Sequence, residues 1–287
     1  MGSLSFRCKL VATASVIFFV AVSAFGPATA QDSAPQSADF LTYNKIRSLE
    51  QMHERFAKKQ IAETDMRDLL RVFYSLSPTD AEKLKRWAEA SPRSYTLRLG
   101  LGLHYRFQSG KVLGGVPLKD APEEKKIESN SLYVSALSEL RAAMDLDDNP
   151  YFSIVHLMAM RMGRDKKETD WLAKEADRVF PENTLARARY ALSLTPRWGG
   201  SYEALQAYIA RTEAEGAPAV TVKKLKAIYE NDLGSTYREL DLQAESNEHY
   251  RRALKLGRET DKTFVADFLK MSFYYVCKTT PVPPECS

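Results

Sequence analysis

The chain has 287 residues, enough for one large domain or two ordinary ones, and 44% hydrophobic with 27% charged residues excludes general disorder. Its 41 Lys and Arg against 37 Asp and Glu give a net charge of +4. This excess is too small for the concentrated basic face of a nucleic-acid-binding protein. We therefore expect a folded domain with a sizeable core and no nucleic-acid partner.

The first 30 residues have the pattern of a secretory signal peptide. Arg7 and Lys9 precede an apolar run over residues 10–25, and Ala-Thr-Ala at 28–30 supplies a small-x-small cleavage pattern. A retained membrane anchor is the alternative, but a helix of that run would span only about 24 Å of a roughly 30 Å hydrocarbon core. The sequence favours cleavage and a periplasmic or secreted protein. Membrane contact is then expected only through the signal peptide, unless it is retained.

The predicted mature chain begins with a flexible linker over residues 31–38, which are small and polar. A helical domain is expected over residues 39–276 and a C-terminal tail over 277–287. In an oxidising compartment, Cys277 and Cys286 are expected to form a disulfide that closes this tail. A loop of about ten residues would contribute roughly 2.7 kcal/mol. A metal or redox pair is the alternative, but no C-x-x-C spacing supports it.

Apolar residues recur every three or four positions along the domain, which is the period of an amphipathic helix. No alternating strand pattern is found. The sequence therefore predicts an all-α fold of about a dozen helices with short connections. Periodic stretches cover residues 40–56, 66–74, 127–144, 151–162, 171–180, 185–194, 202–214, 222–237, 244–255 and 264–276.

Two further helices are predicted from their start signals. Ser77-Pro78 and Ser91-Pro92 each place a capping Ser before a Pro at the first helical position. After the second of these helices, residues 110–123 break the period with three Gly and two Pro. A stretch of this length predicts a surface loop, and a binding loop is the less favoured alternative.

Residues 195–204, T-P-R-W-G-G-S-Y-E-A, form the most distinctive stretch, and we interpret it as a structural corner. Pro196 is expected to end a helix, and Trp198 to fold back as a plug between helix pairs. Gly199 and Gly200 would take conformations that a Cβ penalises, while Arg197 would bond the carbonyls freed at the helix end. Ser201 is a predicted N-cap for the next helix.

A functional interpretation of the corner is kept beside the structural one. In it, Arg197 and Trp198 face a groove and bind an acidic or aromatic group. Together with Arg189 and Tyr202, they are the candidate partner-binding residues. The structural interpretation is favoured because a large indole is costly to expose and a sharp turn accounts for both glycines.

Catalytic signals are weak. The four His are scattered without metal-ligand spacing, so we expect no metal, no cofactor and no catalytic residue. Glu128-Ser129 and Glu245-Ser246 match the Glu-Ser dipeptide of exported lytic transglycosylases, which are also helical superhelices. The Gly-Leu-Met-Gln stretch of those enzymes is absent here. The sequence therefore favours a binding protein over an enzyme.

The last 60 residues resemble a tetratricopeptide repeat. The resemblance is carried by Leu233, Gly234 and Tyr237 in one helix and by Ser246, Tyr250 and Ala253 in the next, with weaker matches at residues 136–143 and 173–181. It implies an array of antiparallel helix pairs forming a curved superhelix, with degenerate repeats. Such arrays present extended surfaces for a protein or peptide partner.

The string P-R-W-G-G-S at residues 196–201, with the helices before it, resembles a family of exported bacterial proteins catalogued as a domain of unknown function. That resemblance implies the same helical-repeat fold and no particular activity. Protein or peptide binding is the expected function. The alternative is an envelope enzyme or a cell-wall polymer binder that uses the groove and the 110–123 loop.

Overall fold

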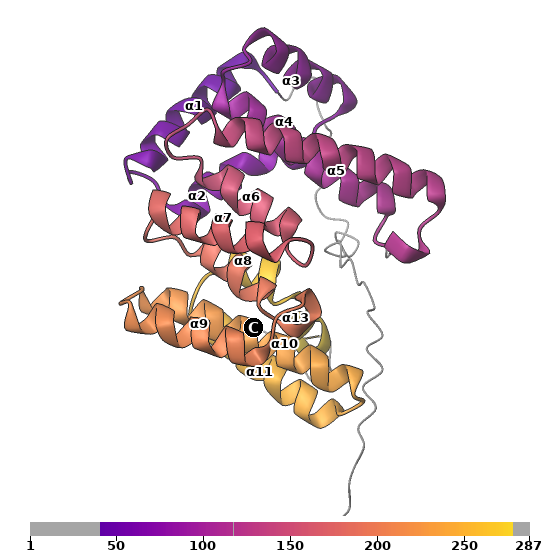
Figure 1. Ribbon diagram of the computed structural model, residues 1–287, viewed down its shortest axis with the longest axis vertical. Coiled ribbons are helices and arrows are strands. Elements are labelled where there is room, and N and C mark those ends of the chain that lie inside the picture. The colour runs from indigo at the N-terminus through magenta and orange to yellow at the C-terminus, as the bar shows by residue number, and fades with distance from the viewer. Residues whose placement is uncertain (1–40, 117, 278–287) are drawn as a thin grey trace, which may run out of the picture.

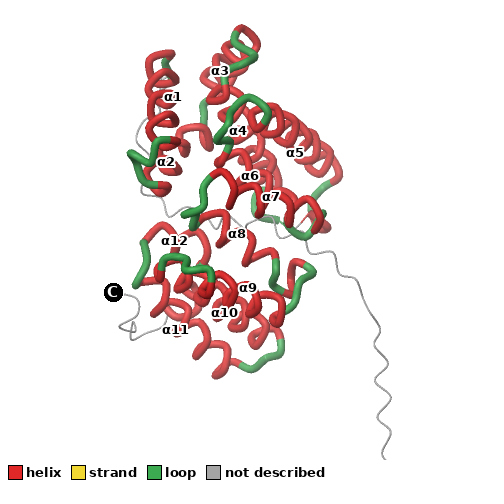
Figure 2. The backbone as a smooth tube through the Cα atoms, turned by 60° about the vertical axis from the view of Figure 1, so that its left-hand side comes forward, coloured by secondary structure: helices red, strands yellow, loops and turns green. Residues whose placement is uncertain are grey.

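The computed structural model describes residues 41–116 and 118–277, and over these residues the fold is all-α, as predicted (Figures 1 and 2). No strand occurs among them. The helices are α1 (Tyr43–Ala57), α2 (Glu63–Leu70), α3 (Pro78–Ala90), α4 (Tyr95–Leu113), α5 (Glu123–Met144), α6 (Tyr151–Arg161), α7 (Lys166–Val179), α8 (Leu185–Ser193), α9 (Tyr202–Ala214), α10 (Ala219–Glu239), α11 (Gln243–Arg258), α12 (Lys262–Phe268) and α13 (Lys270–Cys277). Short 3-10 helices η1 (Arg71–Ser75), η2 (Leu118–Asp120) and η3 (Pro196–Trp198) lie between them.

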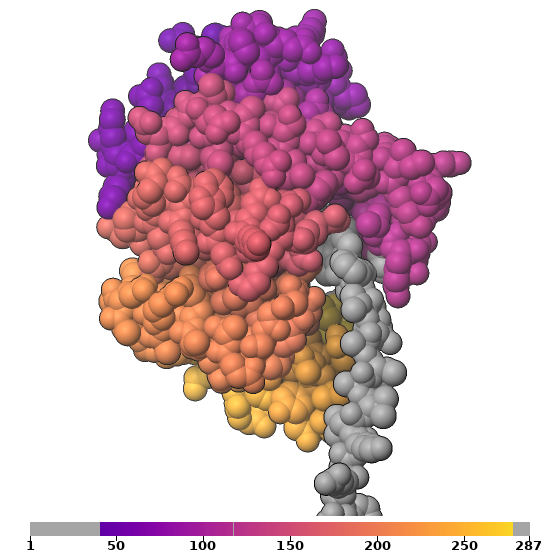
Figure 3. Space-filling model, in the orientation of Figure 1, coloured from indigo at the N-terminus to yellow at the C-terminus, as the bar shows by residue number. Residues whose placement is uncertain are grey.

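Helices α1 to α11 succeed one another along the long axis of the molecule, and α12 then returns to lie beside α8 (Figure 2). In Figure 1, α1 to α5 form the upper part, α6 to α8 the middle and α9 to α11 the lower part. The turn between α4 and α5 projects beyond the body of the molecule, as Figure 3 shows. One apolar core runs from Leu41 to Leu269, so the three parts share a continuous interior.

The helix pairs pack at the positions where the sequence places small residues. In α10, a Cβ on Gly234 would lie 2.5 Å from Tyr250 of α11, and the Ser246 hydroxyl donates a hydrogen bond to the Gly234 carbonyl at 2.8 Å. In the longer pair, Ser109 of α4 and Ser129 of α5 each donate to the other's carbonyl, at 2.8 and 3.0 Å. The small side chains allow the two backbones of each pair to approach closely.

Three predicted boundaries are wrong. Ser91-Pro92 does not open α4; the helix starts at Tyr95, where the Ser94 hydroxyl accepts from the backbone N–H of Leu97, while the Ser91 N–H still bonds the end of α3. The predicted helix over 264–276 is two helices that meet at the buried Leu269. At Ser77-Pro78 the prediction is confirmed, because Ser77 caps α3 with Pro78 in its first turn.

The third wrong boundary is the start of the predicted loop over residues 110–123, because its first residues belong to a helix. Helix α4 continues through Gly110 to Leu113, and η2 occupies part of the remainder. Packing of α4 against α5 outweighs the weak helix propensity of Gly, as tertiary contacts often do. The turn begins only at Gly114, which has a φ of +61°.

The 195–204 corner has the backbone geometry that the structural interpretation expects at Gly199, Gly200 and Ser201. Gly199 has a φ of +85°, and a Cβ on Gly200 would lie 2.1 Å from the Leu194 carbonyl oxygen, so neither position accepts a side chain. Ser201 caps α9 by accepting from the N–H of Ala204. The expected role of Arg197 is wrong, because its Nε pairs with Asp232 of α10 at 2.7 Å rather than with helix carbonyls.

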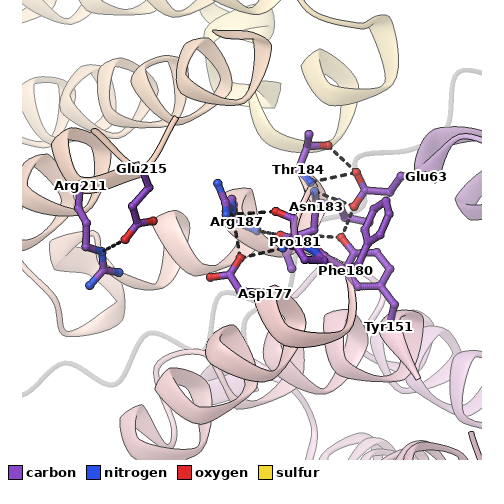
Figure 4. Close-up of polar contacts among 12 residues, drawn as sticks. Glu63, Tyr151, Asp177, Phe180, Pro181, Asn183, Thr184, Arg187, Arg211 and Glu215 are labelled. Carbon is purple, nitrogen blue, oxygen red and sulfur yellow. Dashed lines mark hydrogen bonds and ion pairs between the residues drawn. The ribbon is translucent and has the colours of Figure 1, made fainter. Parts of the chain in front are cut away.

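Glu63, at the start of α2, caps the N-terminus of α8 across more than a hundred residues of sequence (Figure 4). Its carboxylate accepts from the backbone N–H groups of Thr184 at 3.1 Å and Leu185 at 2.9 Å, and from the hydroxyl of Tyr151. The Tyr151 oxygen in turn accepts from the N–H of Ala186 at 3.1 Å. A buried helix end needs such acceptors, and Thr184 supplies none from its own side chain.

Several predictions concern residues that the structure does not describe. The leader over residues 1–30, the linker over 31–38 and Cys286 lie outside the described residues, so cleavage and the disulfide stay predictions. Among the described helices, none has the length and apolar character needed to cross a membrane.

Replacing Glu63 with Ala should lower the free energy of unfolding by about 2 kcal/mol or more, because it leaves the first N–H groups of α8 and the Tyr151 hydroxyl without their acceptor. Urea denaturation of the variant and wild type measures the difference. The control is Glu54→Ala, an exposed position on α1, which should change stability by less than about 0.5 kcal/mol. Equal losses in the two variants would contradict this role for Glu63.

Candidate functional site

A cavity of about 270 Å³ lies between the upper and middle parts of the stack, where residues near α12 and α13 also reach it. It is lined by residues of α2, η1, α4, α5, α6, α8 and η3, and by residues near the junction of α12 and α13. Its size is close to the lower end of the range for small-molecule sites. Because the lining comes from nearly the whole length of the chain, we take this cavity as the candidate functional site.

Positive charge dominates the lining. The cationic side chains are Arg67, Arg71, Arg106, Arg164, Arg189 and Lys270. Among the lining residues that the structure describes, Asp267 is the single carboxylate. The other walls are mostly apolar and include the aromatic side chains Tyr74, Phe107, Tyr133 and Trp198. This composition differs sharply from the nearly neutral charge of the whole chain.

Arg67 enters the cavity from the apolar face of α2, one turn after Glu63. Its side chain is only 8% exposed, and its Nη1 lies 3.5 Å from the carboxylate of Asp267. The other two nitrogens, Nε and Nη2, are buried without a hydrogen-bond acceptor. Arg71 shares the same carboxylate at 3.7 Å but is half exposed. Asp68 also lies 3.6 Å from Nε of Arg67 and 3.1 Å from Nε of Arg71, so two acids serve these two guanidinium groups. Nη2 of Arg67 keeps an unused donor.

Arg106 of α4 and His156 of α6 form a second polar contact in the cavity lining. Nη1 of Arg106 donates to Nδ1 of His156 at 2.7 Å, so the imidazole is neutral. Burial lowers the pKa of His156 well below its usual value, and the nearby Arg106 and Arg189 charges lower it further. Burial also lowers the pKa of Arg106 to about 10, which still leaves the guanidinium charged at neutral pH.

Arg189 reaches the cavity from α8, the helix that Glu63 caps. Its guanidinium carbon lies 4.8 Å from the centre of the Phe268 ring, and its Nε is buried without an acceptor. Burial lowers the pKa of Arg189, and the charge of Arg67 adds to that effect, while Asp267 opposes it. Arg189 thus stands close enough to Arg67 for that charge to lower its pKa, and close enough to Arg106 to lower the pKa of Arg106.

The structure separates the four predicted partner-binding residues into two pairs. Arg189 and Trp198 line the cavity. Trp198 also covers Gly163, where a Cβ would lie 2.7 Å from the indole. Arg197 and Tyr202 instead meet on Asp232, at 2.7 and 3.1 Å, and this contact fixes the corner against α10. The predicted glycines and Pro196 form the corner itself.

Sequence reasoning did not find the other cavity residues, although a signal was present. Arg67 lies three residues before the fully buried Leu70 and so falls on the apolar face of α2. Arg106 follows a run of α4 in which apolar residues occupy every side of the helix. A cation on a helix face that must be buried is a better indicator of a site than a basic run on a polar face.

The described residues do not bring together the groups that the enzymatic alternatives need. Glu128 and Glu245 are exposed, and Ser129 and Ser246 bond helix carbonyls across their helix pairs. No cluster of three His, Cys, Asp or Glu suited to a metal occurs in the described part of the chain. What the cavity offers chemically is hydrogen-bond donation to an anion beside aromatic walls.

Comparison with known proteins adds no relative: the chain matches no protein-family model, no curated protein and no solved structure.

Replacing Arg189 with Met should raise the free energy of unfolding of the ligand-free protein by about 1 kcal/mol, because it removes a buried charge that is repelled by Arg67 and keeps most of the side-chain volume. Chemical denaturation measures the change. Arg86→Met, at an exposed position of α3, serves as the control and should change stability by no more than about 0.5 kcal/mol. A loss of stability in Arg189→Met would contradict the interpretation that the charge of Arg189 destabilises the ligand-free protein.

The free energy of unfolding should fall as the pH drops below about 6.5, because His156 binds a proton in the unfolded chain but not in the folded protein. Because the folded protein lowers the pKa of His156, the neutral imidazole contributes its full stability above the pKa of the unfolded chain. Below that pKa the contribution is lost, by up to about 1.4 kcal/mol per pH unit. In His156→Gln, an amide oxygen can accept from Arg106 without titrating. Urea denaturation between pH 7.5 and 5 should show a shallower decline for this variant, and parallel declines would disprove the assignment.

Proposed function

We propose that the protein is an exported binding protein that holds a protein or peptide partner on the inner face of its helical stack. In this proposal the helix pairs are degenerate tetratricopeptide-like repeats that together form a curved superhelix. The close contact of Gly234 with Tyr250 supports such a repeat in α10 and α11. The signal-peptide pattern over residues 1–30 supports a periplasmic or secreted location.

The single observation that carries the proposal is the composition of the cavity. Arginines and aromatic side chains are the residues that contribute most at binding surfaces, because they combine a large contact area with several directed donors. The lining has both kinds, and a lone acid, Asp267, already engaged by Arg67 and Arg71. General acid–base chemistry would need a second titrating group positioned near the working pH, which favours binding over catalysis.

The partner-binding face can be tested with photoreactive benzoylphenylalanine in place of Asn130, an exposed residue at the cavity on α5. Irradiation in the cells that export the protein should produce a crosslinked protein adduct from this position. The matched control carries the same photoreactive group at Lys85, which is exposed on α3 and does not line the cavity. Mass spectrometry of the adduct measures both its yield and its chemical nature.

Three outcomes bear on the proposal. A protein adduct at position 130 alone supports it, and loss of that adduct in a folded Trp198→Ala variant would place the partner against the cavity wall. Equal adducts at both positions, or none, would refute it. An adduct that contains envelope polymer instead of protein would favour the alternative of a cell-wall polymer binder.

A further inference from the structure

The cavity lining carries more positive than negative charge. Asp267 is the one carboxylate among its described lining residues, and Arg67 and Arg71 pair with it and with Asp68, which does not line the cavity. Arg106 donates to a neutral imidazole, which contributes no negative charge. Arg106 and Arg189 are half-buried, and neither forms an ion pair among the described residues. Two such charges side by side are unfavourable for the fold, so their presence indicates a ligand that supplies negative charge.

The unused donors come from different directions. Arg67 projects from α2 and Arg189 from α8, and each has at least one buried nitrogen without an acceptor. Arg106 reaches the same space from α4. A carboxylate has two oxygens in one plane and suits one or two such groups. A phosphate monoester has three terminal oxygens in a tetrahedral arrangement and carries between one and a half and two negative charges near neutral pH.

The remaining walls suit the organic part of such a molecule. Tyr74 and Phe107 stack with their ring centres 3.6 Å apart. The indole of Trp198, in η3, is another aromatic part of the lining. Trp198 Nε1 is also buried without an acceptor. We propose that the cavity binds a small phosphate monoester, with Arg67, Arg106 and Arg189 around the phosphate and the aromatic side chains against a planar organic group.

This phosphate site goes beyond the proposed function: a cavity of about 270 Å³ fits a small molecule, whereas a protein partner would contact only the side chains at its rim. Failure of ligand binding would leave the crosslinking result at position 130 unaffected, and failure of crosslinking would leave the ligand site unaffected.

Isothermal titration calorimetry of the full-length exported protein tests the inference with phenyl phosphate, inorganic phosphate, benzoate and phenol at constant ionic strength. Phenyl phosphate should bind most tightly, followed by inorganic phosphate, because the phosphate group supplies the charge and the ring supplies additional contact. Benzoate should bind at least tenfold more weakly than phenyl phosphate, and phenol should not bind. Equal binding of benzoate and phenyl phosphate, or no binding of either at millimolar concentration, would overturn the proposal.

Variants locate the binding in the cavity. Arg189→Met and Arg106→Met should each weaken phenyl phosphate at least tenfold, while Arg86→Met on α3 should change its affinity less than twofold. Circular dichroism and thermal melting show which variants are folded, and either cavity variant suffices. A folded cavity variant that binds as tightly as wild type, or an Arg86→Met loss as large as theirs, would also overturn the assignment.

Discussion

The carboxylate of Glu63 is the contact on which the geometry of the cavity depends. It satisfies the first N–H groups of α8 and so fixes where that helix begins relative to α2. The same two helices carry Arg67 and Arg189, which both line the cavity. An ion pair at the surface could shift by an ångström at little cost. A carboxylate that caps the N-terminus of a buried helix has fewer alternative positions, because each backbone N–H that it moved away from would lose its acceptor.

This fixed framework explains how the fold tolerates like charges in its interior. The guanidinium groups cannot move apart without disturbing the helices that hold them, so their repulsion remains as a local cost within a large apolar core. His156 reduces that cost by accepting from Arg106 while staying neutral. Sites for charged ligands commonly lie at such locally unfavourable positions, since the ligand relieves what the ligand-free protein must bear.

The helices could be predicted from the sequence because their signals are local. Apolar spacing and capping serines specify each helix over a few turns, and the corner glycines at 199 and 200 follow from backbone sterics alone. The cavity could not be predicted, because it depends on which distant helix faces which. Arg67 and Arg189 are separated by 122 positions, and no local pattern states that they meet. Arg189 is an exception, because it is among the partner-binding residues predicted from the sequence and it does line the cavity.

The lining runs from Arg67 in α2 to Lys270 at the start of α13, so the cavity forms only when both of these helices are in place. Contacts between such distant residues require the closure of a long loop and belong to the late stage of folding. A ligand that binds only the folded structure stabilises it by mass action and couples the unfolding of α2 to that of α13. Occupancy of the cavity would therefore stabilise the fold as a whole rather than any single helix pair.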